Sequence, residues 1–283
     1  MKEDLNFLEL GVLARELSEK ENSWVKKIYH PVDDVLMFHM YSSEHGKFMV
    51  KVHLPKYLTI TEYKLENPME PSHFVMFLRK YLNNCRLVDI KQPPAERVIE
   101  LYFEGRGQKY ILILEFFSKG NVILCDDKYE ILIPLKSQKW KSRDIRPRKQ
   151  YEYPPKKADL SDLDIANFIE LIKDPNKNQL VKSVAVNLNL GGTYAEELCL
   201  RVGIDKKKPL EELTDSEFRR LLEAFNNLVG ELKTKVKPNV VYENGVAIDV
   251  QPILLKQYEA NEKKFFETYN EALDKFFTKK RVS

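Results

Sequence analysis

The sequence predicts an α+β fold, in which a pseudo-symmetric antiparallel β-sandwich with flanking helices is followed by a helical domain. A helix followed by a meander of strands occurs twice, at 5–53 and at 74–135. The links between the strands are too short for the crossover that parallel neighbours need. A run of helix start and stop signals over 160–229 predicts the helical domain. We expect three parts, which are the sandwich with a basic C-terminal linker (1–155), a helical domain (156–237), and a hairpin leading into a long helix (238–283).

The first helix and meander begin at the N-terminus. Leu5, Leu8, Val12, Leu13 and Leu17 have the spacing of an amphipathic helix that runs to about residue 20. Strands are expected at 24–29, 35–41 and 47–53, with polar turns between them.

The second helix and meander begin at Ser72, which has the side chain of an N-cap for a helix over 74–82. A strand at 85–90 leads to Pro93 and Pro94, which cannot donate to a sheet and so force an extended turn. Gly105 and Gly107 are expected to supply the positive φ of the next hairpin. Further strands are predicted at 97–103, 109–117, 122–125 and 129–135.

Capping residues divide the helical domain. Helices are predicted at 160–173, from Asp174-Pro175 to 190, at 194–202 with Thr193 as the N-cap, and from the capping box that starts at Thr214. The helix, Gly191-Gly192 turn and second helix have the form of a helix-hairpin-helix module, whose helix N-terminus can meet a phosphate, or of a plain turn in a bundle. Asn244-Gly245 predicts a hairpin, and the apolar spacing after residue 252 predicts one long amphipathic helix.

Composition excludes some classes of protein. The 283 residues carry a formal charge of only +3, so the distribution of charge is more informative than its sum. The three cysteines are far apart and the five histidines lack metal-binding spacing, so we expect neither disulfides nor a metal site and no cofactor. No apolar run has the length of a membrane span, and no signal peptide is recognisable. We therefore expect a cytoplasmic protein that does not bind membranes.

Positive charge is concentrated between residues 136 and 157, where nine lysines and arginines face only two acids. Trp140, Tyr151 and Tyr153 lie among these cations, an arrangement suited to an RNA backbone with bases stacked on the rings. The alternative is a solvated linker. The candidate RNA-binding residues here are Lys139, Lys141, Arg143, Arg146, Arg148 and Lys149.

Several spaced motifs resemble the N-terminal region of the NFACT family. They are WVKKIYHP (24–31), FVMFLRKYLNNCRL (74–87), IKQPPAERVIEL (90–101), LILEFFSKGNVILCDD (112–127), YEYPP (151–155), LNLGGTYAEELCLRVGI (188–204) and TYNEALDKFF (268–277). The resemblance implies a fold akin to the N-terminal domain of formamidopyrimidine-type DNA glycosylases. It also implies a ribosome-associated quality control factor, which binds a large ribosomal subunit carrying peptidyl-tRNA. Such a factor recruits aminoacyl-tRNA, alanyl-tRNA in the bacterial members, for template-free tail addition.

The same resemblance implies the recognition residues. The family's acidic residue in the first helix and its Asp-Arg pair match Glu9, Glu96 and Arg97, with glutamate in place of both aspartates. Without the resemblance, Glu96-Arg97 would be read as an ordinary charge pair at a strand start, and neighbours on a strand should face opposite sides. Arg79 is a further candidate for RNA or for the fold.

Two other functional classes compete with this one. A glycosylase needs a reactive N-terminal amine and usually a zinc site, which Met1-Lys2 and the three cysteines do not provide. A fibronectin-binding adhesin would need a secretion signal. We expect a binding protein without chemistry of its own.

Overall fold

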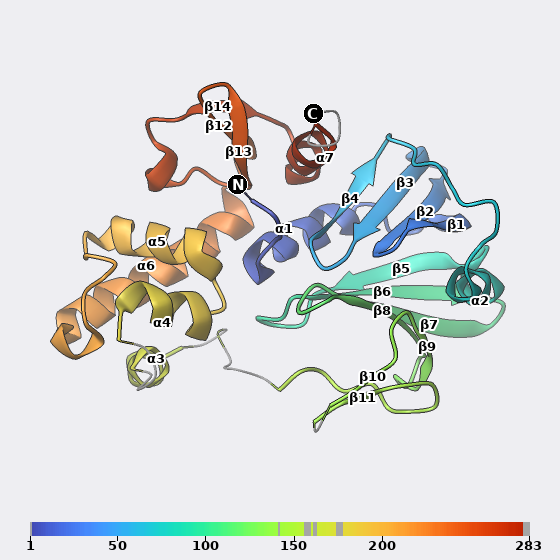
Figure 1. The fold of residues 1–283 in the computed structure, drawn as a ribbon, viewed down its shortest axis with the longest axis horizontal. Coiled ribbons are helices and arrows are strands. Elements are labelled where there is room, and N and C mark those ends of the chain that lie inside the picture. The colour runs from blue at the N-terminus through green and yellow to red at the C-terminus, as the bar shows by residue number, and fades with distance from the viewer. Residues whose placement is uncertain (1, 141, 156–159, 161–162, 174–177, 280–283) are drawn as a thin grey trace.

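The structure is a computed structural model that describes residues 2–140, 142–155, 160, 163–173 and 178–279. The β-sandwich lies on one side of the molecule and the helical unit on the other (Figure 1). A small sheet and the C-terminal helix lie above the junction between them. The expected N-cap at Asp174-Pro175 falls outside the described residues.

Nine antiparallel strands form the sandwich, in the order β4-β3-β2-β1-β5-β6-β7-β8-β9. β1 and β5 meet at their first residues, where Trp24 is in register with Arg86 and backbone hydrogen bonds join 22–25 to 84–87. From this junction the two meanders face each other as two layers (Figure 1). Phe38 of the first layer lines the same apolar gap as Leu101 and Phe103 of the second. The predicted sandwich is confirmed, with β4 as a strand that the sequence patterns missed. The first layer comprises β1 (Trp24–Val32), β2 (Val35–Ser42), β3 (Gly46–His53) and β4 (Tyr57–Thr61), and the second β5 (Arg86–Lys91), β6 (Val98–Gly105), β7 (Gln108–Glu115), β8 (Asn121–Asp126) and β9 (Ile131–Pro134).

One helix packs at each end of the sandwich (Figure 1). α1 (Phe7–Ser18) lies at the end that faces the helical unit, and α2 (His73–Leu82) lies at the opposite end. Ser72 caps α2 as predicted, since its side chain accepts the amide of Val75. α1 begins with a capping box between Asn6 and Glu9, which satisfies two backbone donors that would otherwise lack partners.

The hairpin between β6 and β7 differs from the prediction. Its positive φ values belong to Arg106 (54°) and Gly107 (71°), not to Gly105. Gly105 is required for a different reason, because a Cβ placed there would lie 2.5 Å from the sulfur of Cys85. This glycine allows β6 to approach the end of α2.

The segment after β9 folds back over the outer face of the second layer. It contains the short hairpin of β10 (Gln138–Lys139) and β11 (Asp144–Ile145). A second apolar cluster lies beneath it, which includes Ile145 and Tyr151 together with outward side chains of β6, β7 and β8. Tyr151 is buried, so the expectation that its ring stacks on a base is wrong, whereas Tyr153 is half-buried and packs against the same cluster. The described part of the basic stretch, up to residue 153, is therefore folded and packs on the outer face of the sheet.

The described residues of the helical unit form four α-helices, and one of the predicted caps differs from the structure. Thr214 and Glu217 form the predicted capping box of α6. Thr193 is not an N-cap, because α5 already begins at Gly191, whose φ is +70°. The preceding helix ends at Asn187, and the first helix starts five residues later than expected. The bounds are α3 (Ile165–Ile172), α4 (Leu180–Asn187), α5 (Gly191–Val202) and α6 (Asp215–Thr234).

The C-terminal part is a three-stranded sheet and a short helix, so the predicted single long helix after residue 252 is wrong. The Asn-Gly hairpin is confirmed as β12 (Asn239–Glu243) and β13 (Val246–Gln251), and β14 (Glu262–Phe265) pairs with β12. Glu16 of α1 accepts the amides of Tyr269 and Asn270, each at 2.7 Å, at the start of α7 (Tyr269–Lys279). Phe277 stacks on Tyr57 with the ring centroids 3.9 Å apart. Among the described helices, none has both the length and the apolar character to cross a membrane.

Candidate functional site

Two adjoining clefts lie where the sandwich meets the helical unit. The larger has a volume of about 530 Å³ and is lined by the N-terminal segment, α1, and the turn from α4 into α5. The smaller has a volume of about 290 Å³ and is lined by the turn before β6 and by Phe117, Pro154 and Pro155. Arg97 and Asn189 line both clefts, so the two form one continuous surface.

The turn that carries Glu96 and Arg97 is held against α1. Gln92 Nε2 donates to the carbonyls of Phe7 (2.6 Å) and Glu96 (3.0 Å). Gly11 of α1 permits this contact, since a Cβ there would lie 2.7 Å from Gln92 Oε1. The position of the turn is therefore fixed by the helix behind it.

Arg97 lies at the junction of the two clefts. Its Nη2 donates to Asp4 Oδ2 at 2.8 Å, and 21% of its side chain is exposed. Its Nε is buried and has no hydrogen-bond partner in the part of the chain that the structure describes. A ligand in the clefts therefore cannot reach Nε as it stands, but the exposed part of the Arg97 side chain lines both clefts, where a phosphate or a base edge could bind the guanidinium. Glu96 lines only the smaller cleft, and β6 begins at Val98, so both residues precede the strand.

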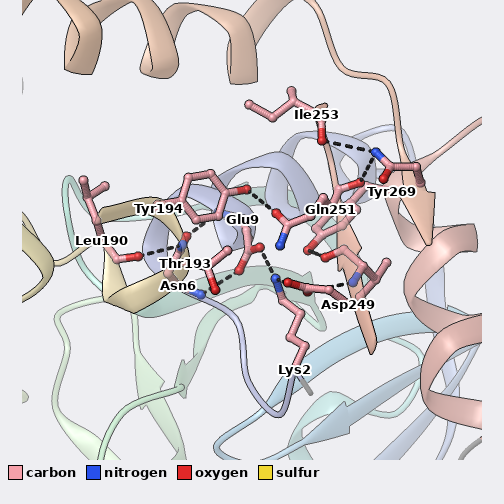
Figure 2. Close-up of polar contacts among 12 residues, drawn as sticks. Lys2, Asn6, Glu9, Leu190, Thr193, Tyr194, Asp249, Gln251, Ile253 and Tyr269 are labelled. Atoms are coloured by element: carbon pink, nitrogen blue, oxygen red, sulfur yellow. Dashed lines mark hydrogen bonds and ion pairs between the residues drawn. The ribbon is translucent and has the colours of Figure 1, made fainter. Parts of the chain in front are cut away.

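Glu9 lies at the edge of the larger cleft, but its carboxylate is buried (Figure 2). It forms an ion pair with Lys2 and accepts the backbone amide of Asn6 at 3.0 Å. Lys2 also lies 3.5 Å from Asp249, to which Tyr258 donates at 2.6 Å. Burial opposes the charge of Lys2, yet the two carboxylates together raise its pKa. The structure therefore makes Glu9 a residue that positions the N-terminal segment, and direct contact with RNA would require this ion pair to open.

The start of α5 forms the opposite wall of the larger cleft. Gly191, Gly192 and Thr193 line the cleft, and a Cβ added at either glycine would meet open space. Leu190, the N-cap residue, makes no side-chain cap, so the first amides of α5 are placed to bind an anion. Asn189 Nδ2 donates to the carbonyl of Ala95 at 3.0 Å, which links this wall to the Glu96 turn.

The basic stretch divides into exposed and buried side chains. Lys139, Arg148 and Lys149 are exposed, and Arg146 is exposed but paired with Asp144. Hydrogen bonding to Arg146 lowers the pKa of Asp144. Arg143 is buried and paired with Glu115, which also accepts the hydroxyl of Tyr151 at 2.9 Å, so Arg143 belongs to the fold and its expected role in RNA binding is revised. Lys141 lies outside the described residues.

Arg79 is remote from the clefts, on α2 at the other end of the sandwich. Its Nε donates to the carbonyl of Ile28 at 2.8 Å, and its guanidinium lies 5.2 Å from the ring centroid of Tyr29. These contacts favour the second of the two expected roles, which is stabilisation of the fold.

The sequence patterns missed four residues of the site: Lys2, Asp4, Asn6 and Asn189. Asn6 could have been found, because Asn followed three residues later by Glu is a capping-box pattern. Lys2 and Asp4 precede the first periodic segment and gave no signal. Within the described ranges, no three His, Cys, Asp or Glu side chains are placed to hold a metal ion.

Comparisons with known proteins were made against families, curated sequences and solved structures. The family model described as NFACT N-terminal and middle domains matches residues 7–283. The archaeal Rqc2 homolog aRqcH of Methanocaldococcus jannaschii is 33% identical over 289 residues, covering 99% of this chain and 43% of that protein. Ribosome quality control complex subunit NEMF of Homo sapiens is 27% identical over 242 residues, covering 77% of this chain and 22% of that protein. The chain spans less than half the length of these relatives.

The similar solved structures have the same fold at low sequence identity. The fibrinogen binding protein from Staphylococcus aureus has a TM-score of 0.76 at 21% identity, covering 96% of this chain and 98% of that one. The N-terminal part of the fibronectin/fibrinogen-binding protein from Streptococcus suis has a TM-score of 0.72 at 19% identity, covering 98% of this chain and 100% of that one. The likeness extends over sandwich and helical unit alike.

Proposed function

Because this chain belongs to the NFACT family, we propose that it acts in ribosome-associated quality control by binding transfer RNA at the paired clefts. The relatives of known name are ribosome quality control subunits and Rqc2 homologs. The observation that best supports tRNA binding is the position of Arg97, whose partly exposed side chain lines both clefts.

The clefts offer complementary contacts to RNA. The guanidinium of Arg97 is planar and suits a phosphate or a guanine edge, and the amides at the start of α5 suit a second phosphate across the larger cleft. Glu96 provides an acceptor for base amino groups or a 2′-hydroxyl in the smaller cleft. Lys139, Arg148 and Lys149 add attraction that does not depend on sequence.

Membership of the family supports a wider role. We propose that the protein recruits aminoacyl-tRNA, with alanyl-tRNA as the first candidate, to a large ribosomal subunit that holds peptidyl-tRNA. The ribosome would join the amino acids without a template, and the protein would act in the cytoplasm as a binding factor without chemistry of its own. Sedimentation with large subunits that do or do not hold peptidyl-tRNA tests this role, since retention should depend on the peptidyl-tRNA.

The two alternative functions have less support. A glycosylase or lyase needs a reactive amine as nucleophile, and the side-chain amine of Lys2 is buried in an ion pair with Glu9. The structural neighbours named for fibrinogen or fibronectin binding share 21% identity or less, which is a likeness of fold.

Filter binding of tRNA to the Arg97→Gln variant tests the site. A charge-assisted hydrogen bond contributes about 1.5–3 kcal/mol, so we expect roughly a 10- to 150-fold loss of affinity. Arg106→Gln is the matched control, because Arg106 lies at the other end of β6, roughly 30 Å away at the rise of a strand. Equal affinity of the two variants would defeat the assignment of the clefts.

A further inference from the structure

Trp140 is an exposed aromatic side chain at the turn of the β10–β11 hairpin. Its side chain is 43% exposed, although tryptophan is usually mostly buried. Its amide donates to the carbonyl of Arg143 at 2.8 Å, which closes the turn. The hairpin lies outside the second layer of the sandwich, on the side from which the chain continues to α3 (Figure 1).

Arg143 holds the Trp140 ring in place from the protein side. Its guanidinium lies 5.7 Å from the ring centroid of Trp140, 5.7 Å from that of Phe117 and 5.4 Å from that of Tyr151. The guanidinium is itself fixed, since it pairs with buried Glu115 and its Nε donates to the carbonyl of Glu152 at 2.7 Å. A ring supported in this way loses little conformational entropy when a second flat group stacks on it.

The charge of the segment that carries Trp140 indicates which kind of group would stack on its ring. Lys139, Arg148 and Lys149 are exposed in the same segment, whereas the acids Asp144 and Glu152 are fewer and Asp144 is paired. Phe117, whose ring centroid lies 5.7 Å from the Arg143 guanidinium, also lines the smaller cleft beside Arg97. A polyanion bound in that cleft therefore passes close to the exposed ring.

We propose that Trp140 is a stacking platform for an unpaired nucleobase of the RNA that binds in the clefts. The proposal rests on the proposed function and extends the binding surface from Arg97 across Phe117 to the hairpin. The base would lie on the open face of the indole, opposite the Arg143 guanidinium. The exposed cations of the same segment would bind the phosphate backbone of the RNA.

Fluorescence tests the proposal directly, because the chain has only two tryptophans. Trp24 is the matched control, since it is 41% exposed and lies on β1 in the other layer. In the Trp24→Phe variant all indole emission comes from Trp140, and we expect saturating unfractionated tRNA to quench it and to protect it from acrylamide. In the Trp140→Phe variant, emission from Trp24 should stay unchanged at the same tRNA concentration.

Affinity distinguishes stacking from a structural role. Stacking on one exposed ring is worth roughly a 5- to 150-fold change in affinity, so Trp140→Leu should weaken tRNA binding by about tenfold while its thermal midpoint stays that of the wild type. For Trp140→Leu, a plot of log K for tRNA binding against log salt concentration should have the same slope as for the wild type, because stacking releases no counterions. Arg148→Gln should instead lower that slope by about 1.

The outcomes separate the two proposals. If the wild type binds tRNA but Trp140 emission does not respond and Trp140→Leu binds normally, the platform is refuted and the proposed function stands. If the wild type fails to bind tRNA, both proposals fall. Retention of most of the affinity by Trp140→Phe, with loss in Trp140→Leu, would confirm that the aromatic face is what the RNA uses.

Discussion

Breaking the buried ion pair between Arg143 and Glu115 should destabilise the sandwich strongly. Their side chains are only 4% and 2% exposed, and the Glu115 carboxylate also accepts the hydroxyl of Tyr151. The Arg143→Met change leaves the Glu115 carboxylate buried without its cation, which costs about 3–5 kcal/mol. At about 2–4 °C per kcal/mol for a chain of this size, the thermal midpoint should fall by roughly 6–20 °C.

The double variant Arg143→Met with Glu115→Gln makes the reasoning testable. The glutamine carbonyl still accepts from Tyr151, and no charge remains buried, so we expect it to recover to within about 1.5 kcal/mol of the wild type. Urea unfolding followed by circular dichroism measures all three free energies, and Arg148→Met, an exposed cation of the same segment, should stay within about 0.5 kcal/mol. Two results would contradict this reasoning. One is a double variant whose loss of unfolding free energy equals the sum of the losses in the two single variants, and the other is an Arg143→Met variant as stable as the wild type.

Two further predictions concern other parts of the chain. Hydrogen bonding to Lys208 lowers the pKa of Glu217 from 4.5 to about 2, so Glu217 stabilises the fold above pH 4.5 and this contribution is lost as the pH falls toward 2. Thermal midpoints of wild type and Glu217→Gln should therefore differ at pH 7 and converge near pH 2, and a constant difference would contradict this. Gly105→Ala places a methyl group 2.5 Å from the sulfur of Cys85 and should cost about 1–3 kcal/mol in urea unfolding. Gly192→Ala, which meets open space, is its control and should change little.

Local chemistry made most of the secondary structure predictable. Ser72 and Thr214 cap helices because their hydroxyls bind amides a few residues away, and Asn244-Gly245 forms a hairpin for equally local reasons. The segment after residue 252 was mispredicted because Phe265, Tyr269 and Phe276 mimic one helical spacing. Phe265 in fact belongs to β14, whose partner β12 is supplied from more than 20 residues earlier.

The family motif drew attention to Arg97, and the structure places this residue beside the clefts. The roles of Glu9 and Arg143 could not be predicted, because they depend on partners that are distant in sequence. Lys2 forms ion pairs with both Glu9 and Asp249, and Arg143 pairs with Glu115, which lies 28 residues earlier in the chain. A charge run shows the number of cations, whereas only the packed structure shows which of them are already neutralised.

Two carboxamide side chains hold the walls of the larger cleft together. Asn6 donates to the carbonyl of Leu190 at 3.1 Å, and Asn189 donates to that of Ala95 at 3.0 Å. Neither link involves an ionised group, so both should persist as the ionic strength rises, whereas the partly exposed ion pair between Arg97 and Asp4 in the same cleft should weaken. Added salt should consequently loosen the side chains that line the cleft before it separates the helical unit from the sandwich.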